Sequence, residues 1–338
     1  MNELEIRIYI NKLIAESETK LEKVYARMLK ETLLEIQRMY TKYKKQGELS
    51  YTDLNKYNRL HNIFDRISET LTEEYRVAVQ ELTAMRKSVY VETYLREAYL
   101  IEVFSSTEMG FQIPSVDIIE SALLNPIEHL RLPKTMKKHR DQIAYDLQIL
   151  ITQALLRGDS YWDMAAEIEK KFGFFTNKAR AVARTEAGRA QSIATEKAME
   201  HASKFVKMTK MWASSLDFRV RTAHRTLDGQ QADIEGYFHY RSLKAKGPHM
   251  WNRADMDINC RCIVLHLVNG MMPSVRRGRN FKDPEYQRKF KAAVQKYMDD
   301  EGLTLAQAVN KANKHIVPPS VEYDGFISYN DWHKKMTA

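Results

Sequence analysis

The chain has 338 residues, of which 44% are hydrophobic and 29% charged, and its formal net charge is +9. That composition is typical of a soluble folded protein and argues against disorder over the whole length. No window of about 18 apolar residues occurs, so we expect no transmembrane helix, and the first ten residues lack the pattern of a signal peptide. A basic excess favours a polyanionic partner, either nucleic acid or an acidic protein surface.

The only two cysteines, Cys260 and Cys262, are separated by a single residue. A disulfide bond between them would be strained. We therefore do not expect a disulfide-stapled secreted domain, and a reducing compartment fits the sequence better.

The N-terminal third of the sequence is nearly free of helix-breaking residues. Its first 113 residues contain no proline and only two glycines, Gly47 and Gly110. Apolar side chains recur at alternating four- and three-residue spacing in two stretches: Leu29, Leu33, Ile36, Tyr40 and Tyr43, then Tyr57, Leu60, Phe64, Ile67 and Leu71. This spacing predicts two long antiparallel helices joined near Gly47, with the second continuing toward residue 108 and the stripes packed in a core.

Shorter helices are predicted in the next part of the chain, where three prolines follow Gly110. An amphipathic helix is expected over about residues 137–156. Ser160 can cap a short helix that Gly173 closes, and Thr176 can cap a further helix that extends to about residue 202.

The pattern changes after Lys204, where β-type residues replace helical spacing. Phe205–Trp212 is a predicted strand of β-type residues interleaved with lysines, and Ile263–Val268 is a short apolar strand that ends at a turn-forming Asn-Gly pair. We expect a small α+β module here, carried on the preceding helices.

The C-terminal part is predicted to be a basic linker followed by helices. The linker has the sequence VRRGRNFKDP, and helices are expected over about residues 284–299 and 303–314. Pro318-Pro319 is predicted to end the regular structure, leaving an aromatic extension.

The predicted fold is mainly α: a long-helix N-terminal domain, then a small α+β module, then a helical C-terminal tail. We place the domain boundaries at residues 1–160 for the helical domain, 161–270 for the module and 271–338 for the linker and C-terminal extension.

Four motifs follow one another between residues 176 and 266. They are ARTEAGRAQ at residues 183–191, a tryptophan strand, the segment from Asp217 to Gly229, and Asn259-Cys260-Arg261-Cys262. In this order they resemble the phage head morphogenesis family named after the minor head protein of phage Mu. The motif residues that carry the resemblance are Arg184, Glu186, Trp212, Asp217, Arg221, His224, Asp228 and Gly229.

The resemblance implies a minor capsid protein of a tailed phage. Such a protein would be bound at the portal vertex inside the head and would act in capsid assembly and in DNA packaging and delivery. The expected partners are the portal protein, capsid or scaffold protein, and double-stranded DNA bound without sequence preference. The expected location is the virion, with the host cytoplasm during assembly.

Arg184 has no acid three or four residues away on its own helix, so its partner must come from elsewhere. The partner is either an acid of the α+β module, with Asp217 and Asp228 as candidates, or a phosphate group. We favour the salt bridge, in which Arg184 docks its helix onto the module.

The segment that begins at Asp217 has two structural interpretations. Asp217, Arg219 and Arg221 alternate, so on a strand or turn they would share one side and could pair across it. Asp228-Gly229 predicts a turn, with the glycine at a positive φ.

Cys260 and Cys262, together with His224, raise the question of a structural zinc ion, which usually has four thiolate or imidazole ligands. The candidates for the remaining ligand are the other histidines of this region: His239, His249 and His266. Against zinc, the usual C-x-x-C spacing is missing. We favour two buried thiols that pack as small apolar groups, without a cofactor.

The motifs of several enzyme classes are missing. The chain has neither the H-x-E and P-C-x-x-C of zinc deaminases nor a P-loop, a G-x-S-x-G or an H-E-x-x-H. We therefore assign no catalytic residue. The alternative hypotheses are a metal-dependent nuclease that uses His224, His249 and His266, and a scaffolding-type protein that leaves the mature head.

Basic residues are concentrated between residues 176 and 225, where eleven lysines and arginines face only four acids. Basic side chains interleaved with aromatic ones suit non-specific contact with nucleic acid, although a solvated basic face beside a core strand is the alternative. The candidate DNA-binding residues come from this stretch and from the basic linker: Arg180, Arg184, Arg189, Lys207, Lys210, Arg276, Arg277 and Arg279.

Overall fold

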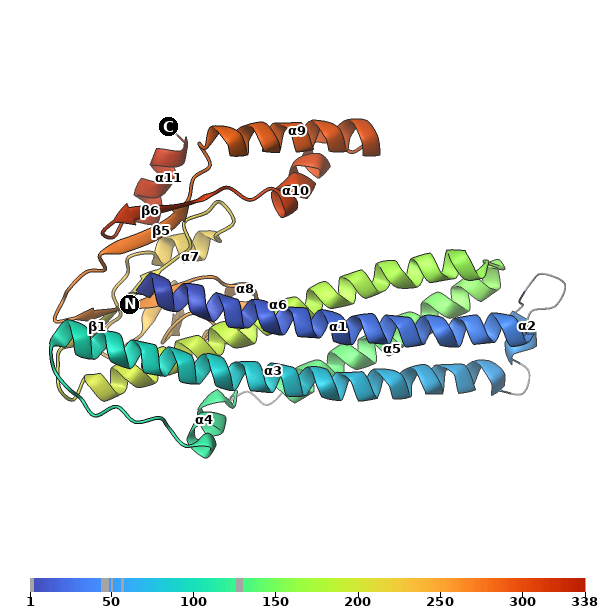
Figure 1. Ribbon diagram of the computed structural model, residues 1–338, viewed down its shortest axis with the longest axis horizontal. Coiled ribbons are helices and arrows are strands. Elements are labelled where there is room, and N and C mark those ends of the chain that lie inside the picture. Colours follow the sequence, from blue (N-terminus) through green and yellow to red (C-terminus); the bar gives the residue numbers. More distant parts are fainter. Residues whose placement is uncertain (1–2, 44–48, 50, 56–57, 126–129, 338) are drawn as a thin grey trace.

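The computed structural model describes residues 3–43, 49, 51–55, 58–125 and 130–337. Long helices form an elongated bundle, and a small α+β module and the C-terminal segment lie at one end of it, beside the N-terminus (Figure 1). This arrangement confirms the predicted mainly α fold, with long N-terminal helices, a small α+β module and a helical tail.

The bundle is built from the helices that precede residue 203. They are α1 (Glu3–Tyr43), α2 (Tyr51–Asn55), α3 (Arg59–Ser105), α4 (Val116–Leu123), α5 (Leu132–Arg157) and α6 (Tyr161–Ala202). None of the helices in the described part of the chain is both long and apolar enough to cross a membrane.

Helices α1 and α3 run antiparallel along the long axis of the molecule (Figure 1). Apart from Tyr57, which lies outside the described residues, the two predicted apolar stripes pack in the core, where Ile36, Leu60 and Leu71 are buried. The prediction of two long antiparallel helices is therefore confirmed, while Gly47, the predicted joint, lies outside the described residues.

Helix α6 is one continuous helix of 42 residues, so the predicted break at Gly173 is wrong. Ser160 caps its start as expected, by accepting a hydrogen bond from the Asp163 N–H group. Thr176 caps nothing; its hydroxyl group donates to the carbonyl oxygen of Phe172 one turn earlier, at 2.9 Å. A glycine inside a helix costs only about 1 kcal/mol, and burial of aromatic side chains on either side, such as Phe172, offsets that cost.

The α+β module contains two small antiparallel sheets. Strand β1 (Met208–Ala213) pairs with β4 (Ile263–Val268), so that Trp212 lies opposite Val264. Strand β2 (Phe238–Tyr240) pairs with β3 (Leu243–Ala245). Two short helices, α7 (Thr222–Leu227) and α8 (Ala254–Asp257), complete the module. Both predicted strands are present, and the bounds of β4 are those expected from the sequence.

The C-terminal segment is more ordered than the sequence suggested. The predicted basic linker forms strand β5 (Val275–Arg279), which pairs antiparallel with β6 (Ser320–Asp324). Strand β6 and helix α11 (Tyr329–Thr337) both follow the two prolines that were expected to end the regular structure. The intervening helices, α9 (Pro284–Glu301) and α10 (Leu305–His315), are close to their predicted bounds.

Burial of aromatic residues explains this order. Tyr329 and Trp332 of α11 pack with Leu216 and Val220 of the module in one apolar cluster. Gly278 lets β5 approach closely, because a Cβ atom at this position would lie 3.0 Å from the Leu216 side chain. The aromatic extension is therefore part of the folded module.

Candidate functional site

The first motif lies on α6, where Arg184 forms an ion pair with Glu18 of α1. The Arg184 Nη2 atom donates to the Glu18 carboxylate at 3.0 Å, and the arginine side chain is 56% exposed. The predicted partners, Asp217 and Asp228, are wrong because each of them binds a different arginine. The structure therefore assigns Arg184 to the contact between α6 and α1.

The next residues of this motif connect α6 to two other parts of the fold. Glu186 pairs with Arg86 of α3 at 3.1 Å, and both side chains are largely buried. The Thr185 hydroxyl oxygen accepts a hydrogen bond from the backbone N–H group of Asn259 at 3.2 Å. The first motif thus contacts the start of the fourth.

Asp217 connects the segment before α7 to the fourth motif. Its carboxylate binds both Nη atoms of Arg261, with Nη2 donating to Oδ1 at 2.9 Å. The predicted side-chain pairing among Asp217, Arg219 and Arg221 is wrong, because the Asp217 carboxylate binds the Arg261 side chain and accepts only the backbone N–H group of Arg219, at 2.8 Å. Arg221 donates instead to backbone carbonyl groups in and beside α8.

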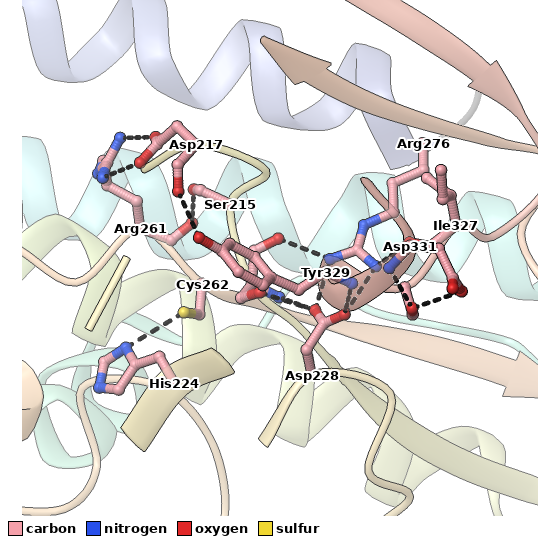
Figure 2. Close-up of polar contacts among 12 residues, drawn as sticks. Ser215, Asp217, His224, Asp228, Arg261, Cys262, Arg276, Ile327, Tyr329 and Asp331 are labelled. Atoms are coloured by element: carbon pink, nitrogen blue, oxygen red, sulfur yellow. Dashed lines mark hydrogen bonds and ion pairs between the residues drawn. The ribbon is translucent and has the colours of Figure 1, made fainter. Parts of the chain in front are cut away.

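Asp228 lies at the centre of a buried polar network (Figure 2). Its carboxylate accepts hydrogen bonds from the N–H group of Ser214 and that of Tyr329, each at 2.7 Å. Arg276 donates to the same carboxylate at 2.5 and 3.1 Å, and also to the carbonyl oxygens of Ser214 and Ile327. The Asp228 and Arg276 side chains are only 2% and 7% exposed. This network ties the module to β5 and α11.

Trp212 is the centre of the apolar core of the module and is fully buried. Its ring packs edge-on against His224, Phe238 and Trp251, with centroid separations of 5.7, 5.3 and 6.0 Å. The Gly229 N–H group donates to the Trp212 carbonyl oxygen at 2.8 Å, and the positive φ of this glycine, 79°, agrees with the predicted turn. Trp212 is therefore not exposed for stacking with nucleic-acid bases.

His224 of α7 lies against both cysteines, and Figure 2 shows its contact with Cys262. Its Nδ1 atom is 3.3 Å from the Cys262 sulfur and 3.4 Å from the Cys260 sulfur, and all three side chains are buried. Contact with the Cys262 thiol, together with the His224 imidazole, lowers the pKa of Cys260. Burial raises the pKa of Cys262.

The other histidines of this region lie outside the group formed by His224 and the two cysteines, although His249 is close to Cys260. His249 is buried against Gly188 of α6, so closely that a Cβ atom on this glycine would overlap the imidazole ring, and burial lowers the pKa of His249. His266 pairs with Glu97 of α3 at 3.0 Å, and His239 binds Asp233 on the surface. The metal-type ligand group in the described part of the chain combines His224 with the two cysteines and contains neither His249 nor His266. The three-histidine nuclease site is therefore not formed.

Three of the candidate DNA-binding residues are wrong, because they are buried and bound to other parts of the protein. Arg189 donates to the Leu123 carbonyl oxygen at 3.0 Å. Lys210 is 1% exposed and forms an ion pair with Glu196, and burial lowers its pKa. Arg276 belongs to the network around Asp228. Each of these cations stabilises the fold and cannot reach a DNA backbone.

The other five candidates keep at least part of the side chain at the surface. Arg180 pairs with Glu22 of α1, much as Arg184 pairs with its neighbour on the same helix. Lys207 and Arg277 are exposed, whereas Arg279 is half-buried and donates to the carbonyl oxygen of Pro318 at 3.0 Å.

A cavity of about 670 Å³ lies between the start of α1, helix α6 and the module. The motif residues His224, Cys260 and Cys262 contribute to its wall, as do two acids, Glu18 and Asp217, each paired with an arginine. Most of its charged lining is arginine: Arg7, Arg184, Arg219, Arg221, Arg261, Arg277 and Arg279. The cavity therefore carries a net positive charge.

Sequence reasoning did not assign Arg7, Arg261 or Glu18 to the site. Arg261 stands inside the fourth motif, which is a signal that could have identified it. Arg7 donates to the Ser215 hydroxyl group at 3.0 Å, but it lies on a helix without any recognisable motif. Its place, like that of Glu18, depends on how α1 packs beside the module.

Comparison with known proteins identifies a family and several relatives of this chain. A family model described as "Phage Mu protein F like protein" matches residues 146–265, which include the four motifs. The chain is 28% identical over 270 residues to a protein of Enterococcus faecalis named NAD(+)--arginine ADP-ribosyltransferase EFV, covering 79% of this chain and 55% of that protein. No solved structure matches.

The sequence match to a second relative extends over most of the length of both proteins. The minor head protein GP7 of Bacillus phage SPP1 is 36% identical over 281 residues, which is 82% of this chain and 91% of that protein. The match covers more of the chain than the family model does. The chain therefore belongs to the family of phage minor head proteins.

Proposed function

We propose that this virion component, which acts in head morphogenesis, is attached at the portal vertex inside the capsid and takes part in DNA packaging and delivery. The observation that supports this role is the match to a minor head protein over 82% of the chain. The partners in this proposal are the portal protein, capsid or scaffold protein during assembly, and packaged double-stranded DNA. We assign it a structural role without catalysis.

The arginine-lined cavity supports the proposed contact with DNA. Arg219 and Arg277 line it, are exposed, and have no carboxylate partner among the described residues. Unpaired guanidinium groups on a concave surface bind phosphates through charge and planar hydrogen bonds, without reading the base sequence. The proposed DNA contact is therefore weak, independent of sequence and sensitive to salt.

Fluorescence anisotropy with a short duplex, measured over a salt series, tests this contact. We expect affinity to fall by orders of magnitude between about 50 and 200 mM salt if several phosphates are bound. The Arg219→Ala/Arg277→Ala variant should bind more weakly, with a salt slope reduced by about 1 to 2. The Arg241→Ala/Arg253→Ala variant is the matched control, since it also removes two exposed arginines of the same module, and both lie outside the cavity.

Two results would contradict the DNA contact. One is equal loss of affinity in the cavity variant and in the control, which would mean that only net charge matters. The other is a preference for one duplex sequence of more than about tenfold, because phosphate contacts carry no direct sequence information. Absence of binding at low salt would leave a protein partner as the reason for the charge.

Attachment to the portal needs a separate test. We expect the protein to be present in purified virions by quantitative mass spectrometry and to co-purify with the portal protein when the two are expressed together. Detection in immature heads but not in virions would support a scaffolding-type protein instead.

A further inference from the structure

Three potential metal ligands meet in the module, and they come from two separate segments. His224 is on α7, whereas Cys260 and Cys262 precede β4. The ligand atoms of the three side chains lie within 4.8 Å of one another, and all three residues are buried. Figure 2 shows His224 and Cys262 pointing toward each other.

The separations between these atoms are close to those of a tetrahedral zinc site. Zinc binds an imidazole nitrogen at about 2.0 Å and a thiolate sulfur at about 2.3 Å, so neighbouring nitrogen and sulfur ligands lie about 3.5 Å apart. The two observed distances from His224 Nδ1 to sulfur are 3.3 and 3.4 Å. Both separations between His224 and a sulfur atom therefore fit a single ion bound to all three side chains.

Hydrogen bonding alone does not satisfy this group. A neutral imidazole nitrogen has either one proton or one lone pair, so Nδ1 can bond fully to only one of the two sulfurs. A cation placed between the three atoms would bind Nδ1 and both sulfurs at once.

The surroundings also favour a metal over two neutral thiols. The backbone N–H group of Cys262 points at the Cys260 sulfur at 3.4 Å, a contact that stabilises a thiolate. Two thiolates balance the charge of one divalent ion. The cavity that all three residues line can supply water as the fourth ligand.

We propose that the Nδ1 atom of His224 and the thiolates of Cys260 and Cys262 bind one zinc ion. The ion joins α7 to the segment that precedes β4 and thereby holds the third and fourth motifs together. Its role is structural, and it is independent of the proposed contact with DNA.

Titration of the metal-free full-length protein with Co²⁺ tests the site directly, because tetrahedral Co²⁺–thiolate complexes absorb strongly in the visible range. We expect saturation at about one Co²⁺ per chain, displacement by Zn²⁺, and proton release on binding, since the thiols must ionise. The His224→Ala, Cys260→Ala and Cys262→Ala variants should each bind at least about 100-fold more weakly. His239→Ala is the control, because this exposed histidine of the same module lies outside the ligand group and should leave binding unchanged.

Wild-type protein alone can overturn the proposal, even if the cysteine variants do not fold. Zinc at one equivalent should protect both thiols from a thiol-specific reagent, and a chelator should restore their reaction and lower the melting temperature. Equal thiol reactivity with and without zinc would refute the site. So would a wild-type chain that takes up no Co²⁺ or Zn²⁺ at micromolar metal.

Discussion

The buried ion pair between Asp228 and Arg276 holds three segments together, so its loss should be costly. The Asp228→Asn substitution removes the negative charge and keeps the size of the side chain. It leaves Arg276 buried with two carbonyl contacts but without a counter-ion. The carboxylate of Asp228 accepts hydrogen bonds from the N–H groups of Ser214 and Tyr329. The NH₂ group of an asparagine would face one of these donors and could not accept its hydrogen bond.

The expected size of the effect follows from burial. Both side chains are less than one-tenth exposed, and removing one partner of such a pair costs about 3–5 kcal/mol because the other charge remains in a poorly solvated site. A typical domain has a free energy of unfolding of about 5–15 kcal/mol. Asp228→Asn should therefore remove a large part of the stability of the module and lower its melting temperature by several degrees or more.

Urea unfolding followed by circular dichroism measures this loss, and Asp255→Asn provides the control. Asp255 also pairs with an arginine of the module, but that pair is 51% and 63% exposed, so its loss should change stability far less than the loss of the buried pair. Limited proteolysis gives a second measurement, because loss of the contact to Tyr329 should expose the C-terminal helix. If both variants lose the same stability and α11 stays protected, the role given to Asp228 is wrong.

Three further substitutions test other contacts. Gly188→Ala should destabilise the protein because its Cβ atom would overlap the His249 ring, whereas Gly173→Ala, with open space around it, should be neutral or stabilising in thermal melts. Burial lowers the pKa of His139 from 6.5 to about 4, so the unfolded chain binds the proton more readily and stability should fall by roughly 3 kcal/mol as pH decreases through this range; His139→Phe should remove that part of the pH dependence. Arg184→Ala should cost about 1 kcal/mol, since the arginine side chain of its ion pair with α1 is 56% exposed; a loss above about 3 kcal/mol would mean that leaving the 14% exposed Glu18 unpaired dominates the effect.

The parts of the fold that could be predicted depend on local pattern. The apolar stripes on α1 and α3 have helical spacing, and the run Ile263–Val268 is too short and too apolar for anything but a buried strand or helix segment. In both cases the pattern that predicts the element lies within a few residues of the sequence. The four motifs likewise identified most of the residues that meet in the module, because they are close together in the sequence.

The parts that could not be predicted depend on distant residues. Arg184 was expected to bind Asp217 or Asp228, but the packing of α1 beside α6 brings Glu18 to it from 166 positions away. Strand β5 resembles a basic linker until its partner, β6, is known, because three of its five residues are arginines and one is a glycine, and such a strand is stabilised by the strand beside it. The pairing of Asp217 with Arg261 could not be predicted for the same reason, because the two residues are 44 positions apart in the sequence.

Counting charges in a sequence window overestimates the surface that is available to DNA. Between residues 176 and 225 the basic excess is large, but α1 supplies Glu18 and Glu22 to neutralise two of its arginines. Buried cations such as Lys210 form ion pairs with acids inside the protein, because an unpaired buried charge is strongly destabilising. What remains for a phosphate is the set of exposed arginines without an acid, and Arg219 of the cavity belongs to it. The DNA-contacting surface of a basic minor head protein is therefore better sought among its unpaired guanidinium groups than along its most basic stretch of sequence.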